Sequence, residues 1–185
     1  MKGKVPMNPF ALHTEHTAPA ASRPVLAAVQ KQFGFVPNLV RMLAESPSAV
    51  EGYATLVRLV DASSLDARER HVVQQTVNLA NECHYCVPAH GAIAARAGLG
   101  ELDAALRSGA PLGDAKLEAL RTFTRAVVVR RGRVEDADVA AFQAAGYSHA
   151  AILDVLLAVA MKTLSNYANR IARTPIDAIF LGRAA

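Results

Sequence analysis

Apolar residues along most of this 185-residue chain recur at the three- to four-residue spacing of helices, and no segment shows the period-2 alternation of strands. Local signals mark helix ends. Ser46-Pro47 and Ser148 are typical of helix starts, whereas Gly34 and Gly98 are typical terminators. Alanine, leucine and valine dominate a composition with only 5% aromatic residues, which suits packed helices. We therefore expect an all-α, single-domain helical bundle of antiparallel helix pairs.

The first 21 residues differ from the rest of the chain. Pro6, Pro9 and Pro19 fall within them, and no helical periodicity precedes Ser22-Arg23-Pro24. Proline at interior helix positions removes a hydrogen bond and clashes with the preceding turn. We therefore predict an extended N-terminal segment over residues 1–21, followed by one helical domain over residues 22–185.

Charge and hydropathy indicate neither a membrane nor a nucleic acid as a partner. The longest apolar run, residues 150–161, contains Asp154 and is shorter than the roughly 20 residues that span a bilayer. The N-terminus has no apolar run of signal-peptide length. The net charge is only +4, and the one tight basic group, Arg130-Arg131-Gly-Arg133, suits a solvated loop. We expect a cytoplasmic protein.

The two cysteines, Cys83 and Cys86, are separated by two residues. Structural disulfides are unusual in the reducing cytoplasm, so this pair indicates a catalytic or metal-binding role. On a helix over residues 83–97, Cys83, Cys86 and His90 fall at i, i+3 and i+7 and share one face. Pro88 supports a helix start at this point, because proline costs little in the first turn but about 3 kcal/mol in a helix interior.

This arrangement favours thiol redox chemistry. The partial positive charge at a helix N-terminus stabilises a thiolate, and His90 is placed to accept the thiol proton. Because His90 follows Cys86 by one turn, we expect Cys86 to be the nucleophile and Cys83 the resolving thiol. A peroxide would oxidise Cys86 to a sulfenic acid, Cys83 would form the disulfide, and a dithiol or protein-thiol reductant would restore both.

Two other interpretations remain open at this point. Cys83, Cys86 and His90 would give zinc three ligands, with His84 or His71 as a fourth, although no second ligand pair exists. A redox-responsive interaction protein without turnover would also use a reversible disulfide. Haem attachment needs a histidine directly after the second cysteine, and iron–sulfur clusters need more thiolates. We expect no metal and no cofactor.

The motif Cys83-x-x-Cys86-x-x-x-His90, preceded by a helix containing Leu65–Val73, resembles the alkylhydroperoxidase D-like group of the carboxymuconolactone decarboxylase-like superfamily. The segments Phe33–Asn38, Ala44–Pro47, Ser165–Asn169 and Thr174–Asp177 are similar to its peroxidase-related subgroup. The resemblance implies an all-helical homo-oligomer, a trimer or a dimer of trimers. It also implies weak activity against organic hydroperoxides or hydrogen peroxide. Decarboxylases of the superfamily lack the cysteine pair, so decarboxylation is not expected.

By this resemblance Cys86 is the peroxidatic cysteine, Cys83 resolves it and His90 belongs to a proton relay. The family carries a glutamate twelve residues before the first cysteine, where this chain has His71, and often a histidine directly before the second, where it has Tyr85. Candidates to complete the relay are Glu69, His71, Glu82 and Tyr85, of which Glu69 and His71 enter our predicted site. We expect Asn166 and Asn169 to be polar contacts at a subunit interface rather than catalytic groups.

Overall fold

The computed structural model describes residues 10–182, and within that range it contains nine α-helices, two short 3₁₀ helices and no strand. The predicted all-α fold class is confirmed. In chain order the elements are η1 (Ala20–Ser22), α1 (Arg23–Phe33), α2 (Asn38–Leu43), α3 (Pro47–Asp61), α4 (Ala67–Ala80), α5 (Cys86–Arg96), α6 (Gly100–Ser108), α7 (Ala115–Val129), α8 (Asp136–Ala144), α9 (His149–Ala172) and η2 (Ala178–Leu181).

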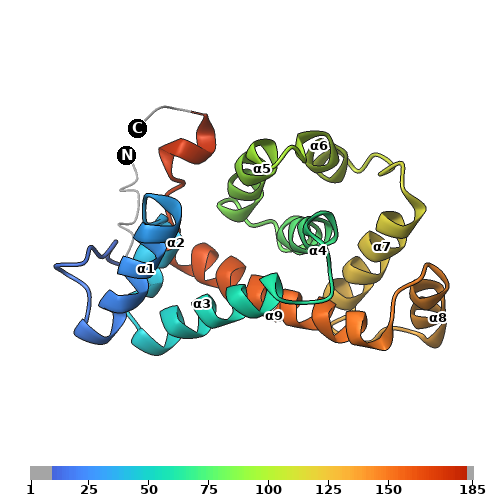
Figure 1. Ribbon diagram of the computed structural model, residues 1–185, viewed down its shortest axis with the longest axis horizontal. Helices are drawn as coiled ribbons and strands as arrows, with labels where there is room; N and C mark the ends of the chain where they lie inside the picture. Colours follow the sequence, from blue (N-terminus) through green and yellow to red (C-terminus); the bar gives the residue numbers. More distant parts are fainter. Residues whose placement is uncertain (1–9, 183–185) are drawn as a thin grey trace, which may run out of the picture.

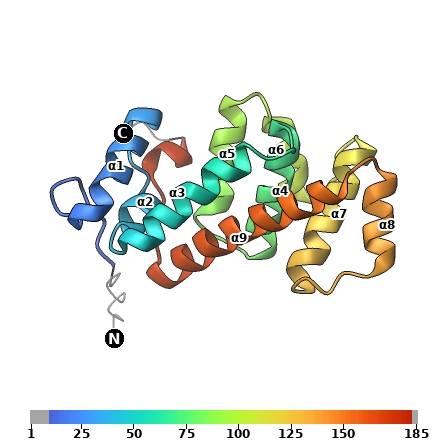
Figure 2. The ribbon, with the colours of Figure 1, turned by 60° about the horizontal axis from the view of Figure 1, so that its bottom comes forward.

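Helix α4 is the centre of the molecule. It packs against α5, α6, α7 and α9, which surround it in Figure 1. The long helix α9 runs beneath α4 and continues alongside α3, as Figure 2 shows. Helices α1 and α2 lie at one end of the molecule with η2, and α7 and α8 lie at the other end. The cysteine motif at the start of α5 therefore lies between α4, α9 and η2.

Most helix starts follow the capping signals in the sequence. The Ser46 and Ser148 side chains accept the N–H groups of Ala49 and Ala151, as predicted. Asp66 and Glu69 form a reciprocal capping box at the start of α4, which satisfies two backbone donors. Ser22 differs: its hydroxyl is buried and donates to the Ala44 carbonyl at 2.7 Å instead of capping α1.

The helix predicted over residues 83–97 begins three residues later, at Cys86. Helix α4 ends at Ala80 with Asn81 as its C-cap, and Glu82 then takes a left-handed conformation with φ 48°. The Cys83 N–H donates to the Asn78 carbonyl at 3.0 Å, so Cys83 closes the turn after α4 rather than opening α5. Pro88 is still the third residue of α5, within the first turn, where its missing N–H costs little.

The buried apolar side chains form two main clusters. One fills the space between α4, α7, α8 and α9 and contains the stacked rings of Phe123, Phe142 and Tyr147. The other joins α1–α3 to the start of α5 and contains Cys83 and Cys86. The cysteine pair is thus built into a hydrophobic cluster.

Both ends of the described chain pack onto the second cluster. The His13 N–H donates to the Arg41 carbonyl, and Ala18 is buried; the first nine residues of the predicted extended segment lie outside the described range. At the other end Phe180 makes edge-to-face contacts with Phe35 and Tyr85, so the segment after α9 packs against α5 and the loop before α2.

By length and composition, α9 is the one helix of the described chain that could cross a membrane. It packs against α3, α4 and α7 and buries a lysine and two asparagines. These contacts are those of a core helix.

Candidate functional site

The two cysteines are free thiols placed at the junction between the turn after α4 and the first residue of α5. Each is only 2% exposed. The Cys86 N–H donates to the Cys83 sulfur at 3.2 Å, which orients the resolving position against the start of the helix. The structure therefore brings Cys83 and Cys86 together as the spacing predicts, with the first cysteine just outside the helix.

The Cys86 sulfur also receives a hydrogen bond from α9. The Asn169 side-chain N–H donates to the Cys86 sulfur at 3.3 Å. One turn further along α5, the Lys162 ammonium donates to His90 Nε2 at 2.9 Å. Two contacts therefore connect the same faces of α5 and α9, one at the thiol and one at the imidazole.

These neighbours separate the pKa values of the two thiols. A hydrogen bond from the Cys83 thiol, the nearby Lys162 charge and the Asn169 donor together lower the pKa of Cys86 well below the ordinary value, against the effect of burial. The same hydrogen bond and burial raise the pKa of Cys83. These opposite shifts favour the proton on Cys83 and the thiolate on Cys86.

His90 does not contact the thiol directly. Its Nε2 atom accepts the Lys162 hydrogen bond, so this nitrogen carries no proton. Burial, followed by the charges of Lys162 and His71, lowers the pKa of His90 well below the ordinary value and keeps the ring neutral. The hydrogen-bond partner of His90 Nε2 is therefore Lys162 and not the Cys86 thiol, whose proton the sequence analysis expected His90 to accept.

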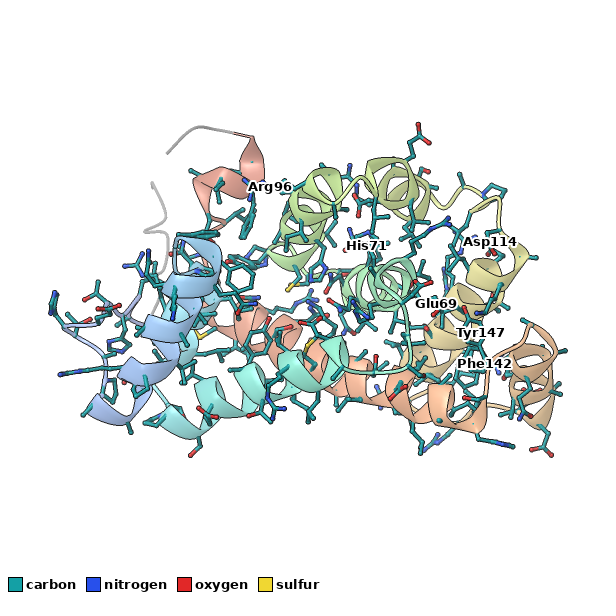
Figure 3. All side chains as sticks on the ribbon, in the orientation of Figure 1. Glu69, His71, Arg96, Asp114, Phe142 and Tyr147 are labelled. Carbon is teal, nitrogen blue, oxygen red and sulfur yellow. The ribbon has the colours of Figure 1, made fainter. Side chains whose placement is uncertain are left out.

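His71 lies behind His90, and its ring centroid is 6.3 Å from that of His90. Figure 3 shows His71 on the side of α4 that faces α5 and α6. Its Nε2–H donates to Asp103 of α6 at 3.2 Å, and the same carboxylate accepts from Gln75 and Arg107. Burial lowers the pKa of His71, whereas Asp103 opposes that shift. The structure therefore places His71 beside the site, held by a buried carboxylate that the sequence analysis did not select.

A chain of amides connects α4 with α9 beneath the cysteines. Asn166 donates to Asn78 at 2.9 Å, and Asn78 donates to Gln75 at 3.0 Å. The expectation that Asn166 and Asn169 are interface contacts is wrong: both are buried within the chain, and Asn169 bonds to Cys86. The apolar helix turns this polar face inward because the polar groups of α4 and α5 supply its partners.

Glu69 is fully engaged away from the cysteines. One carboxylate oxygen accepts the Asp66 N–H at 2.9 Å, and the other pairs with Lys116 at 2.9 Å. In Figure 3 it lies near Asp114 and Tyr147, toward α7. Its place two residues before His71 turns it about 200° around the helix, to the opposite side. Glu69 is therefore a capping and ion-pairing residue in this structure.

The remaining relay candidates, Tyr85 and Glu82, and the zinc-ligand candidate His84 have partners other than the thiols. Tyr85 donates its hydroxyl to Asp177, and His84 donates to the Thr174 carbonyl at 3.0 Å. Both contacts hold the segment after α9 against the start of α5. Glu82 is exposed and lies 3.9 Å from Arg170. These residues anchor the surroundings of the pair.

The zinc interpretation does not fit this geometry. The Lys162 ammonium occupies the lone pair of His90 Nε2, and a metal ion in that position would be repelled by the same charge. No group of three or more His, Cys, Asp or Glu side chains within residues 10–182 is arranged to hold a metal.

Lys162, Asn169 and Asp103 are the functional candidates that the sequence analysis missed. A signal for the first two was present. Lys162, Ser165, Asn166 and Asn169 fall at i, i+3, i+4 and i+7 and form a polar stripe at the end of an otherwise apolar helix. For Asp103, one acidic residue among several on a short amphipathic helix, the sequence carries no distinguishing signal.

This fold has solved counterparts. A peroxidase-related protein with an alkylhydroperoxidase AhpD core from Ralstonia eutropha JMP134 superposes with a TM-score of 0.82 at 23% identity, over 94% of each chain. A peroxidase-related protein from Silicibacter sp. TM1040 gives 0.81 at 22% identity, over 99% of this chain and 98% of that one. The debrominase Bmp8, solved as a cysteine-to-alanine variant with 2,3,4-tribromopyrrole, gives 0.79 at 16% identity, over 98% and 96%.

The fold and the paired thiols define the class: an all-α protein with the alkylhydroperoxidase AhpD-like fold and a buried Cys-x-x-Cys site. Residues 44–126 match the profile of the carboxymuconolactone decarboxylase family. The resemblance predicted from the motif is thereby confirmed. Among curated protein sequences, none matches this chain. The matched region contains both cysteines and His90 but ends before Lys162.

Proposed function

We propose that this chain is a thiol-dependent peroxidase that reduces organic hydroperoxides or hydrogen peroxide. The observation that carries the proposal is the environment of Cys86. Its sulfur accepts hydrogen bonds from Asn169 and from Cys83 and lies in the field of Lys162, which stabilises a nucleophilic thiolate. The peroxidase-related proteins of the same fold support the same reaction class.

In the proposed reaction the Cys86 thiolate attacks one peroxide oxygen and becomes a sulfenic acid. The Cys83 sulfur then displaces water from Cys86 to give the disulfide. Retention of the proton on Cys83 suits this order, because the Cys83 thiol is required to react only after the sulfenic acid has formed on Cys86. A dithiol or protein thiol reduces the disulfide by exchange, and we propose a cytoplasmic location because such reductants are maintained there.

Cysteine variants test the proposal. Consumption of cumene hydroperoxide in the presence of dithiothreitol is expected in the parent protein and lost in Cys86→Ser. Cys83→Ser should still make the sulfenic acid, which dimedone traps on Cys86, but without forming the disulfide. Full turnover by Cys86→Ser would refute the assignment. A reversible disulfide without catalytic peroxide consumption would instead identify a redox-responsive interaction protein.

We also propose that the protein is a homo-oligomer, a trimer or a dimer of trimers. The outer face of α9 supports this: Leu153, Tyr167 and Ile171 are 66%, 56% and 69% exposed, and Leu156 is 41% exposed. A continuous apolar stripe of this kind marks an association surface. Light scattering after size exclusion is expected to give a multiple of the chain mass that Ile171→Asp reduces. A monomer at micromolar concentration would contradict the proposal.

A further inference from the structure

Lys162 is the one buried cation in the neighbourhood of the cysteine pair. Its side chain is 1% exposed, and its ammonium has a single hydrogen-bond partner within the described residues, the neutral imidazole of His90. Lysine is almost never fully buried without a partner of opposite charge, because removing an ammonium ion from water is costly. Among the described residues no carboxylate pairs with it. Burial lowers the pKa of Lys162, and the negative charge on the cysteine pair, chiefly on Cys86, opposes that shift.

The contacts between α5 and α9 place Lys162 relative to the sulfur. Cys86 and His90 are one turn apart on α5, and Asn169 and Lys162 are two turns apart on α9. Asn169 reaches the sulfur and Lys162 reaches the imidazole, so the ammonium lies between the two helices on the side of the sulfur toward His90. The charge of this ammonium acts on the Cys86 sulfur.

We propose that Lys162 is the proton donor of the peroxidase reaction, a role that rests on the function proposed above. Its ammonium group balances the Cys86 thiolate before the reaction and protonates the oxygen that leaves when the O–O bond breaks. His90 is a positioning residue, because its unprotonated Nε2 holds the ammonium by one hydrogen and leaves the others for the sulfur and the substrate.

The step balances as follows. The Cys86 sulfur forms a bond to the terminal oxygen of ROOH and loses two electrons, the O–O bond breaks, and RO⁻ takes a proton from Lys162 to leave as ROH. Cys83 then displaces hydroxide from Cys86 and gives it the Cys83 proton, which yields water and the disulfide. Reduction by a dithiol returns a proton to each sulfur, and the Cys86 proton passes to the Lys162 amine.

Other titratable groups around this lysine come from three elements. Tyr53 lies on α3 and His71 on α4, and His90 and Cys86 lie on α5. Burial raises the pKa of Tyr53, and burial lowers the pKa values of both histidines. At neutral pH these three groups are uncharged, which leaves the thiolate and the ammonium as the interacting charges.

The first test measures the charge balance without peroxide. In Lys162→Met the pKa of the Cys86 thiol is expected to rise by at least one unit, so its rate of alkylation by iodoacetamide falls about tenfold or more at pH 4, where the thiolate is the minor form in both proteins. Lys162→Arg keeps the positive charge and should restore most of the reactivity. Lys116→Met removes an exposed lysine elsewhere and is expected to leave the pH profile unchanged. Far-UV circular dichroism checks that each variant is folded.

The second test separates proton donation from thiolate stabilisation. Cumene hydroperoxide releases a strongly basic alkoxide, whereas a peracid releases a carboxylate that needs no proton. After correction for thiolate fraction, Lys162→Met should lose about 10²–10⁴-fold in rate with the hydroperoxide but under tenfold with peracetic acid. Equal losses with both oxidants would overturn the proton-donor role.

The two proposals fail in distinguishable ways. If Lys162→Met has the parent's alkylation profile and the parent's hydroperoxide rate, the role of Lys162 is wrong and the peroxidase proposal stands. If the parent consumes no peroxide, the peroxidase proposal fails and Lys162 loses its role as donor. The alkylation profile then shows separately whether Lys162 balances the thiolate.

Discussion

The two ends of α9 differ in what they bury. The first half packs into the cluster with α4, α7 and α8, where Phe123, Phe142 and Tyr147 stack and the contacts are apolar. The second half faces the cysteine motif and buries Lys162, Asn166 and Asn169 against other polar groups. Apolar burial stabilises the first region directly. In the second region, hydrogen bonds offset the cost of burying polar groups that would be more stable in water. We therefore attribute its polar composition to the chemistry of the site rather than to the stability of the fold.

The largest expected effect falls in the apolar region. Phe142→Ala removes a ring that is 1% exposed and stacked on two neighbours, and we expect it to lower the free energy of unfolding by about 3–5 kcal/mol. Urea denaturation measures the loss. The alkylation profile of Cys86 in the folded variant should be unchanged. A shifted pKa of the Cys86 thiol would show that the two regions of α9 are energetically coupled, and it would contradict their separation into a stabilising region and a chemical one.

The polar region should instead make stability depend on pH. Burial lowers the pKa values of His71 and His90 in the folded state below their unfolded value near 6.5, so the unfolded chain takes up protons first as pH falls. The histidine contribution to stability is therefore complete above pH 6.5 and declines below it, by at most about 1.4 kcal/mol per pH unit for each histidine. The lowered pKa of Cys86 adds a further rise of stability with pH, which continues up to the ordinary thiol value of about 8.5 and is unaffected by the histidine variants. Urea denaturation at pH 5 to 8 measures this slope. A slope unchanged in His71→Gln and in His90→Gln would contradict the assignment.

The two regions also differ in how much of each could be predicted from the sequence. The fold class and most helix ends followed from caps and periodicity, which are local: Ser46, Ser148 and Gly34 act within one turn. The cysteine pair followed from its own spacing. Lys162 did not, because its contact with His90 joins residues 72 positions apart. Periodicity identifies which residues share one face of a helix, but it does not identify the side chains of other helices that contact this face.

Glu69 shows the same limit of sequence analysis for a residue that was selected for the predicted site. Glu69 and His71 entered the predicted site together, although side chains two positions apart on a helix point in nearly opposite directions. Asp103 was out of reach for the sequence analysis, because only the packing of α6 on α4 makes it the acceptor for His71 and Gln75.

A smaller effect is expected where the chain end is held against the motif. Tyr85→Phe removes the hydrogen bond to the Asp177 carboxylate, which also accepts the Asn38 N–H. A hydrogen bond to a charged group is worth about 1.5–3 kcal/mol, and we expect a loss at the lower end of that range. Hydrogen exchange should increase over residues 174–182. Tyr167→Phe, at an exposed tyrosine, is the control and should change neither quantity.

The smallest effect is expected at Glu69. Glu69→Gln can keep the capping hydrogen bond with Asp66 and loses only the ion pair with Lys116, whose side chain is half exposed. We therefore expect less than about 1 kcal/mol of destabilisation. Peroxide turnover should remain at the parent level. A hundredfold loss of turnover would instead indicate that Glu69 takes part in the proton relay.

The central claim is that Cys86 is a thiolate at neutral pH because of its neighbours. Alkylation by iodoacetamide from pH 4 to 10, followed by mass spectrometry of the peptides that contain each cysteine, measures both thiols in the parent protein. The account predicts that Cys86 reacts with a pKa well below 7, near 5, while Cys83 stays unreactive until far higher pH. A Cys86 pKa near the ordinary thiol value of about 8.5 would contradict it.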